Sequence, residues 1–93
     1  MSLRDDLTDA AEDEIARAVT LDWRQLSKHL PWGDTFEGIS PGGRDVCFER
    51  TYLWDDATGG DIRVEVTVFE PRAYEGGVKR TRSIPRPLSR ENT

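Results

Sequence analysis

The sequence predicts a small α+β domain, in which one or two N-terminal helices pack on a three- to four-stranded antiparallel β-meander. Two observations lead to this fold class. Apolar residues recur every three to four positions before Pro31, as in a helix, and at every second position after Asp34, as in a strand. Turn sequences rich in glycine separate the alternating segments, so consecutive strands are expected to pair as hairpins.

The first helix is expected to begin at Leu3 and to run for about 16 residues, because one face is apolar throughout. Ser2 can cap its start, and Asp5 and Asp6 lie where the helix dipole favours negative charge. The apolar stripe is rich in alanine and lies close to whatever it covers. It consists of Leu3, Leu7, Ala11, Ile15, Ala18 and Val19.

A second, shorter helix is expected after Asp22. This residue and Gln25 have the spacing of a capping box, and Pro31 ends the helix because proline cannot continue it. The pattern leaves open whether the two helices are separate or form one bent helix. The expected apolar face consists of Trp23, Leu26 and Leu30.

Three strands are expected at residues 35–39, 44–54 and 62–68. Residues 40–43 form a turn, because Pro41 presets the first central position and Gly42 tolerates a positive φ at the second. A loop at 55–60 joins the next two strands, which should form a hairpin with coinciding inner faces. These faces consist of Val46, Phe48, Tyr52 and Trp54 in one strand and Ile62, Val64, Val66 and Val68 in the other.

A fourth strand is expected to follow a turn at residues 75–77. Folding the chain there pairs Arg72 with Arg80 and Glu70 with Arg82, one repulsive and one attractive cross-strand pair. The domain is therefore expected to cover residues 1–84. Residues 85–93 contain prolines and basic residues and are expected to form a flexible tail.

The composition is that of one soluble domain, since 93 residues with 33% charged side chains are too few for two domains. Its charge is uneven. Residues 1–70 hold 16 acidic against 7 basic side chains, whereas residues 71–93 hold 2 against 6. The basic C-terminal part either binds an anionic partner or balances the acidic part of its own chain.

Membrane insertion and secretion are not expected, because the apolar runs are short and the acidic N-terminus does not resemble a signal peptide. Cys47 is the only cysteine, so an intrachain disulfide is excluded. We expect a cytoplasmic protein.

Arg50 is the most informative residue of the sequence. It occupies an inward position between Phe48 and Tyr52, where the alternation of the strand predicts an apolar side chain. An unpaired guanidinium in a core costs several kcal/mol, so we expect a carboxylate partner, either Glu14 of the helix or a neighbour in the sheet. The alternatives are a site for a partner's carboxylate and a side chain that reaches the sheet edge.

The candidate interaction residues fall into two groups. Trp23, Trp32 and Trp54 are many tryptophans for a small domain, and they serve either as core filling or as exposed anchors for another protein. The second group is a basic segment without aromatic residues to stack on nucleic-acid bases. Its candidate residues are Lys79, Arg80 and Arg82.

No catalytic, cofactor or metal site is expected. His29 and Cys47 are single soft ligands, and one of each gives no ligand spacing. The loop that begins with Asp55 and Asp56 does not have EF-hand spacing. The Gly42-Gly43 and Gly76-Gly77 pairs lack the strand-to-helix context of a phosphate loop.

The leading functional hypothesis is a small non-enzymatic protein-interaction module that binds another protein or itself. Self-association into a homodimer through a sheet edge or a helix face is the second expectation. One alternative is a nucleic-acid accessory protein that uses the basic C-terminal segment. The other is an acidic inhibitor of a basic partner, resembling an immunity protein or antitoxin. Its phosphate-mimicking residues would be Asp5, Asp6, Asp9, Glu12, Asp13 and Glu14.

Overall fold

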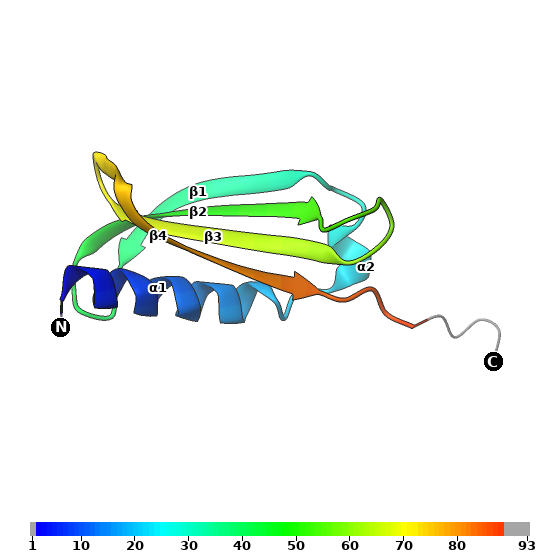
Figure 1. Ribbon diagram of the computed structural model, residues 1–93, viewed down its shortest axis with the longest axis horizontal. Coiled ribbons are helices and arrows are strands. Elements are labelled where there is room, and N and C mark those ends of the chain that lie inside the picture. The colour runs from blue at the N-terminus through cyan, green and yellow to red at the C-terminus, as the bar shows by residue number, and fades with distance from the viewer. Residues whose placement is uncertain (1, 89–93) are drawn as a thin grey trace.

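The computed structural model describes residues 2–88 and consists of one long helix packed against a four-stranded antiparallel sheet (Figure 1). The strand order is β1-β2-β3-β4, so each strand pairs with its neighbour in the sequence. This confirms the predicted α+β meander with four strands. The elements are α1 (Leu3–Ala18), α2 (Trp23–Leu26), β1 (Trp32–Ile39), β2 (Asp45–Trp54), β3 (Ile62–Glu70) and β4 (Ala73–Ile84).

Helix α1 has the predicted length of 16 residues. Ser2 caps its start, because the Asp5 amide donates to the Ser2 hydroxyl oxygen at 3.1 Å. Leu7, Ala11 and Ile15 are at most 1% exposed. The predicted stripe therefore lies against the sheet from Leu7 onward, whereas Leu3 at its start is 38% exposed.

Helix α2 is separate from α1 and shorter than predicted, since it ends at Leu26 rather than before Pro31. The amide of His29 donates to the Leu26 carbonyl at 2.9 Å, so a tight turn follows the helix. The Leu30–Pro31 peptide is cis. Strand β1 begins at Trp32, three residues earlier than predicted, and this extended segment leaves no room for a longer helix.

The β1–β2 connection is the predicted tight turn, in which the Gly43 amide donates to the Ser40 carbonyl at 2.9 Å. The prediction for its glycines was wrong in one detail. The residue with a positive φ is Gly43, at 90°, and not Gly42 at the second central position. Gly42 lies instead against Asp6 of α1.

Strands β2 and β3 pair as predicted, with Tyr52 opposite Val64 and Trp54 opposite Ile62. Their inner faces coincide and form the centre of the core. The valines of β3 have no exposed surface, in accord with the strict alternation of that segment.

The predicted register of β4 was wrong. The chain turns at Pro71 and Arg72, whose φ is 69°, and not at residues 75–77. Arg80 therefore lies opposite Val66 and Arg82 opposite Val64, so the two predicted cross-strand pairs do not form.

The core explains the observed register of β4. It places Val78 opposite Val68 and Ile84 opposite Ile62, and all four side chains are at most 6% exposed. Gly76 and Gly77 do not form the predicted turn but lie inside β4, beside a shift of register. A Cβ on Gly77 would lie 2.9 Å from the Val68 carbonyl oxygen, so this position has no room for a side chain.

The chain beyond β4 remains attached to the domain as far as Arg86. The Arg86 amide donates to an Asp61 carboxylate oxygen at 2.9 Å, and its guanidinium donates to the Gly59 carbonyl at 3.0 Å. The predicted flexible tail covers residues 85–93. Residues 89–93 lie outside the described part of the chain, so the flexibility of this tail stays a prediction.

Candidate functional site

Helix α1 covers only half of the inner face of the sheet. It packs against β3 and β4, while β1 lies at the far edge (Figure 1). The inner side chains of β3 are fully buried, whereas those of β1 keep part of their surface in solvent. An open strip of sheet therefore remains between the helix and β1.

We call this strip the α1–β1 groove. It has a volume of about 500 Å³ and is bounded by Leu21 at one end, where a further apolar hollow of about 380 Å³ begins. Trp32 lies in that hollow, and both Trp32 and Leu21 are 42% exposed. The groove is lined by Glu14, Arg17, Ala18, Leu21, Asp34, Phe36 and Arg50.

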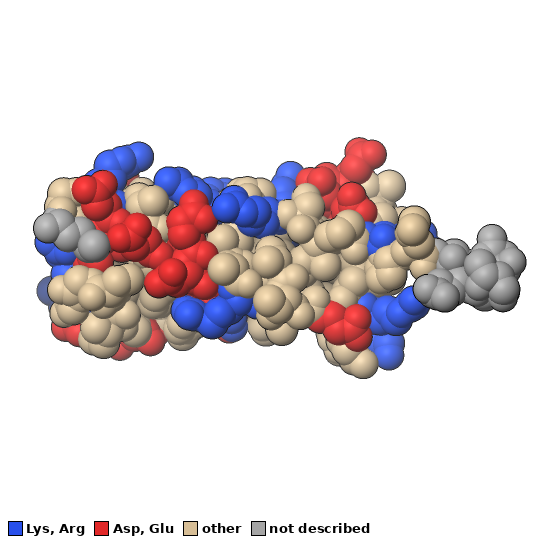
Figure 2. Space-filling view, turned by 90° about the horizontal axis from the view of Figure 1, so that it is seen from below, with Lys and Arg blue, Asp and Glu red and all other residues tan. Residues whose placement is uncertain are grey.

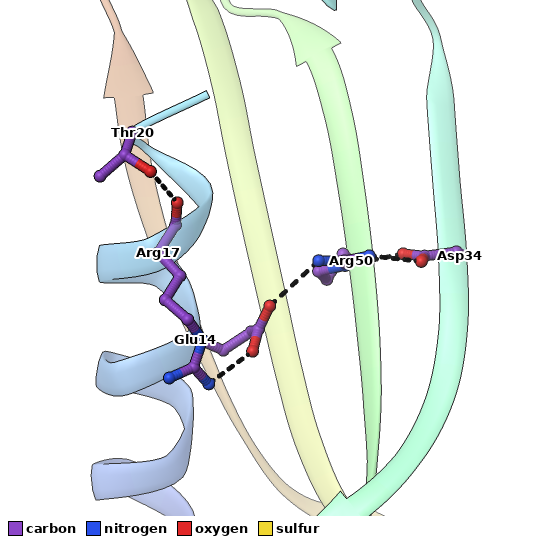
Figure 3. Close-up of polar contacts among 5 residues, drawn as sticks. All are labelled: Glu14, Arg17, Thr20, Asp34 and Arg50. Atoms are coloured by element: carbon purple, nitrogen blue, oxygen red, sulfur yellow. Dashed lines mark hydrogen bonds and ion pairs between the residues drawn. The ribbon is translucent and has the colours of Figure 1, made fainter. Parts of the chain in front are cut away.

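Arg50 lies at the centre of the groove and joins the helix to the edge strand (Figure 3). Its Nε donates to Asp34 Oδ1 at 2.8 Å, and a second nitrogen donates to the other oxygen of the same carboxylate. Its Nη1 donates to Glu14 Oε2 at 3.1 Å. The prediction that Arg50 needs a carboxylate is confirmed, and Glu14 and a sheet neighbour both supply one.

The guanidinium of Arg50 carries a permanent charge. The hydrogen bonds that Arg50 donates to Asp34, opposed by burial, raise the pKa of Arg50 further above its high ordinary value. The side chain of Glu14 is only 7% exposed, and it also accepts a hydrogen bond from Arg17 at 2.8 Å. Two guanidinium groups therefore compensate the charge of this buried carboxylate.

Aromatic rings line the cluster. The Arg50 guanidinium lies 4.7 Å from the centre of the Phe36 ring and 6.0 Å from that of Trp32, which are cation–π distances. Phe36 stacks on Phe48 with ring centres 4.9 Å apart, and Trp32 lies 5.1 Å from Tyr52. The groove thus combines flat apolar surfaces with a compensated ionic centre.

The Tyr52 hydroxyl is a polar group without a compensating contact. It is buried, and it forms no hydrogen bond with the residues that the structure describes. Burial raises the pKa of the Tyr52 phenol, which therefore stays neutral at physiological pH.

The three candidate tryptophans do not form one surface. The indole N–H of Trp23 donates to the Gly60 carbonyl at 2.9 Å, and its ring packs 6.0 Å from that of Trp54. Trp23 and Trp54 fill the core beside the β2–β3 loop. Of the three, only Trp32 lies beside the groove, in the adjoining apolar hollow.

The three candidate basic residues are engaged by the chain itself. Arg80 and Arg82 both bind Glu12 of α1, at 2.8 and 3.0 Å. Lys79 binds Glu65 of β3 at 3.1 Å. These contacts agree with charge balance inside the domain, the second of the two alternatives that the sequence allowed.

The acidic residues of α1 divide between the inside and the outside of the domain. Asp6, Glu12 and Glu14 bind basic groups of the sheet or of the β1–β2 turn. The remaining three are exposed to solvent. They are Asp5, Asp9 and Asp13. Figure 2 shows acidic side chains gathered over α1.

Sequence reasoning missed the role of Asp6, which is fully buried. Its carboxylate accepts hydrogen bonds from the Ser40 hydroxyl, from the Gly42 amide at 2.7 Å and from Arg44 at 2.8 Å. The Ser40 hydroxyl is the main reason why the pKa of Asp6 is lowered. A signal existed, because Asp6 and Glu14 are eight positions apart and so lie on one flank of the apolar stripe.

Asp34 and Leu21 were also missed. The sequence pattern placed Asp34 before the first strand, where it had no assigned face. Leu21 comes after the last residue of the predicted helical stripe, Val19, and had no assigned partner. Only the observed start of β1 and the position of α1 reveal both as groove residues.

Residues 2–88 contain no cluster of three or more histidine, cysteine, aspartate or glutamate side chains arranged to hold a metal ion. No helix in this part of the chain is long and apolar enough to span a membrane. No protein family, curated protein or solved structure matches the chain.

Proposed function

We propose that this chain is a non-enzymatic protein-interaction module whose binding surface is the α1–β1 groove together with the adjoining edge of β1. One observation carries the proposal. Half of the inner face of the sheet is left without a helix, and this half lies directly beside an edge strand.

The chemistry of the groove supports binding rather than catalysis. Its two carboxylates, Glu14 and Asp34, both accept hydrogen bonds from Arg50, so neither is poised as a general base. Covering half-exposed apolar side chains with a partner, in contrast, contributes favourable binding free energy. Tryptophan is also common at the centre of interfaces. A partner that adds an extended segment to β1 can place side chains in the groove at every second position.

A partner-capture experiment tests the proposal. The Leu21→Asp variant places a charge at the junction of the groove and the apolar hollow, and it should reduce capture of partner proteins from cells that express the chain at least tenfold. Leu88→Asp is the control, since Leu88 is 89% exposed and outside the groove. Equal capture by both variants and the unmodified chain would contradict the proposal.

The two alternative functions have less support. Under the acidic-inhibitor hypothesis, only Asp5, Asp9 and Asp13 remain available to bind a basic partner. The other three acidic residues of the helix form ion pairs within the domain. The nucleic-acid hypothesis needs cations that are engaged by Glu12 and Glu65. Neither has an observation that favours it over the groove.

A further inference from the structure

We infer that the edge of β1 binds a second copy of this chain, so that two sheets join into one across a twofold axis. The inference rests on the proposed function and deepens it by naming one partner. Three features of the molecule support it, namely the backbone groups that β1 leaves unpaired, the contrast between the two sheet edges and a register that suits the side chains.

The backbone of β1 offers a regular set of donors and acceptors to a new strand. The amide of Ser40 donates to the Arg44 carbonyl at 2.9 Å, which continues the β1–β2 register. In an antiparallel ladder alternate residues face the same neighbour, so the even-numbered residues of β1 bond to β2. The N–H and C=O groups that face the open edge belong to Gly33, Thr35, Glu37 and Ile39.

The two edges of the sheet differ in how they are protected. Strand β4 contains a shift of register and carries Lys79 and Arg82, whose side chains stay more than half exposed despite their ion pairs, and both features oppose edge-to-edge pairing. Strand β1 contains no lysine, arginine or proline, and its register with β2 is uninterrupted. The charge of Asp34, an acidic residue of this strand, is compensated by Arg50. The edge of β1 is therefore the one suited to pairing.

Three symmetric registers for a β1–β1 pair are unfavourable. A twofold axis at Glu37 places two glutamates opposite each other. An axis at Asp34 brings Glu37 opposite Pro31 of the second copy. An axis at Thr35 brings Ile39 opposite Pro31 of the second copy, and proline has no N–H to donate.

An axis at Phe36 satisfies all outward-facing groups. Gly33 then lies opposite Ile39 of the second copy, and Thr35 lies opposite Glu37. Each of these pairs exchanges two hydrogen bonds, which gives about eight across the interface. We therefore assign the axis to Phe36.

The side chains agree with this register. On the outer face, Ile39 is 64% exposed and gains cover over Gly33 of the second copy, which has no side chain to obstruct it. On the inner face, Phe36 of one copy meets Phe36 of the other. Because each Phe36 stacks on its own Phe48, the interface joins four aromatic rings in one row.

Light scattering and sedimentation of the full chain test the dimer with the Thr35→Pro variant. Proline removes an outward N–H but no hydrogen bond to β2, so the variant should fold as judged by circular dichroism and should dissociate at a concentration at least tenfold higher. Thr35→Val keeps the N–H and should match the unmodified chain. A monomeric unmodified chain at high micromolar concentration, or equal association of Thr35→Pro, overturns the inference.

Disulfide trapping in a Cys47→Ser background tests the register. Residues 35 and 37 of different copies lie directly opposite, within reach of a disulfide, whereas two copies of residue 35 are diagonal and too far apart. A mixture of Thr35→Cys and Glu37→Cys should form a covalent dimer, and each variant alone should not. Equal linking of Thr35→Cys alone, or no linking in the mixture, overturns the assigned register.

The outcomes separate the inference from the proposed function. If Thr35→Pro is monomeric and still captures the partner that Leu21→Asp loses, self-pairing and partner binding are independent. If the unmodified chain is monomeric but Leu21→Asp loses the partner, only the self-pairing is wrong.

Discussion

The two halves of the sheet differ in what covers them, and their side chains differ accordingly. Under α1 the inner face of β3 consists of isoleucine and valine residues without exposed surface. In the uncovered half, the same inward alternation carries Arg50 and Asp34 between aromatic rings. A charged pair is tolerated there because solvent still reaches the guanidinium, whose side chain is 22% exposed. The position of the helix therefore separates a structural half from a half that remains available for binding.

The largest expected effect is the loss of a core side chain in the covered half. Ile15→Ala should lower the free energy of unfolding by about 3 kcal/mol, since it leaves a closed cavity. Phe36→Ala in the open half should cost about 1 kcal/mol, because solvent fills the space that the half-exposed ring leaves. Urea denaturation, with both changes made in the Thr35→Pro background, measures the difference. An equal decrease in the free energy of unfolding for both variants would show that the groove is part of a closed core.

The ionic centre of the open half should have an intermediate effect. Arg50→Met leaves Glu14 and Asp34 without their shared partner and should cost about 2 kcal/mol. Arg17→Met is the matched control and should cost less than about 0.5 kcal/mol, because that side chain is 67% exposed. The double variant Arg50→Met/Glu14→Leu should regain at least half of the loss. A double variant less stable than Arg50→Met would show that Glu14 stabilises the domain through contacts other than its ion pair with Arg50.

The smallest effect is expected at Tyr52. Tyr52→Phe removes a buried hydroxyl that has no partner within the described chain, so the free energy of unfolding should stay unchanged or rise by up to about 1 kcal/mol. Tyr74→Phe serves as the comparison, because its hydroxyl donates to Glu49 at 3.1 Å. A clear loss of stability in Tyr52→Phe would show that the hydroxyl makes a contact that stabilises the groove.

Much of the fold was predictable because local patterns and tertiary contacts agree. The alternation in β3 predicted its buried face. Arg50, at an inward position where the pattern calls for an apolar residue, predicted an ion pair that the structure contains. The register of β4 was not predictable from its turn signal. Two glycines at 76 and 77 favour a turn, but burying Val78 and Ile84 outweighs that local preference.

The candidate site was predictable only in part. Arg50 and Trp32 were identified, but the groove depends on which strands α1 covers, and a helix with an alanine-rich stripe can pack over any pair of strands. That choice is made by contacts between distant residues, such as Asp6 with the turn at Ser40. The sequence indicated the Arg50–Glu14 pair because Arg50 interrupts the alternation of its strand, but no comparable signal connects Asp6 with Ser40.

The two inward carboxylates of α1 have a consequence for how the helix is positioned. Small, smooth side chains such as those of Ala10, Ala11 and Ala18 allow a helix to rotate about its axis or slide along it with little change in packing. Asp6 and Glu14 are separated by about 12 Å along that axis. The β1–β2 turn binds Asp6, and Arg50 of strand β2 binds Glu14. Two such anchor points fix both the rotation and the axial position of the helix, and so determine how wide the uncovered strip is.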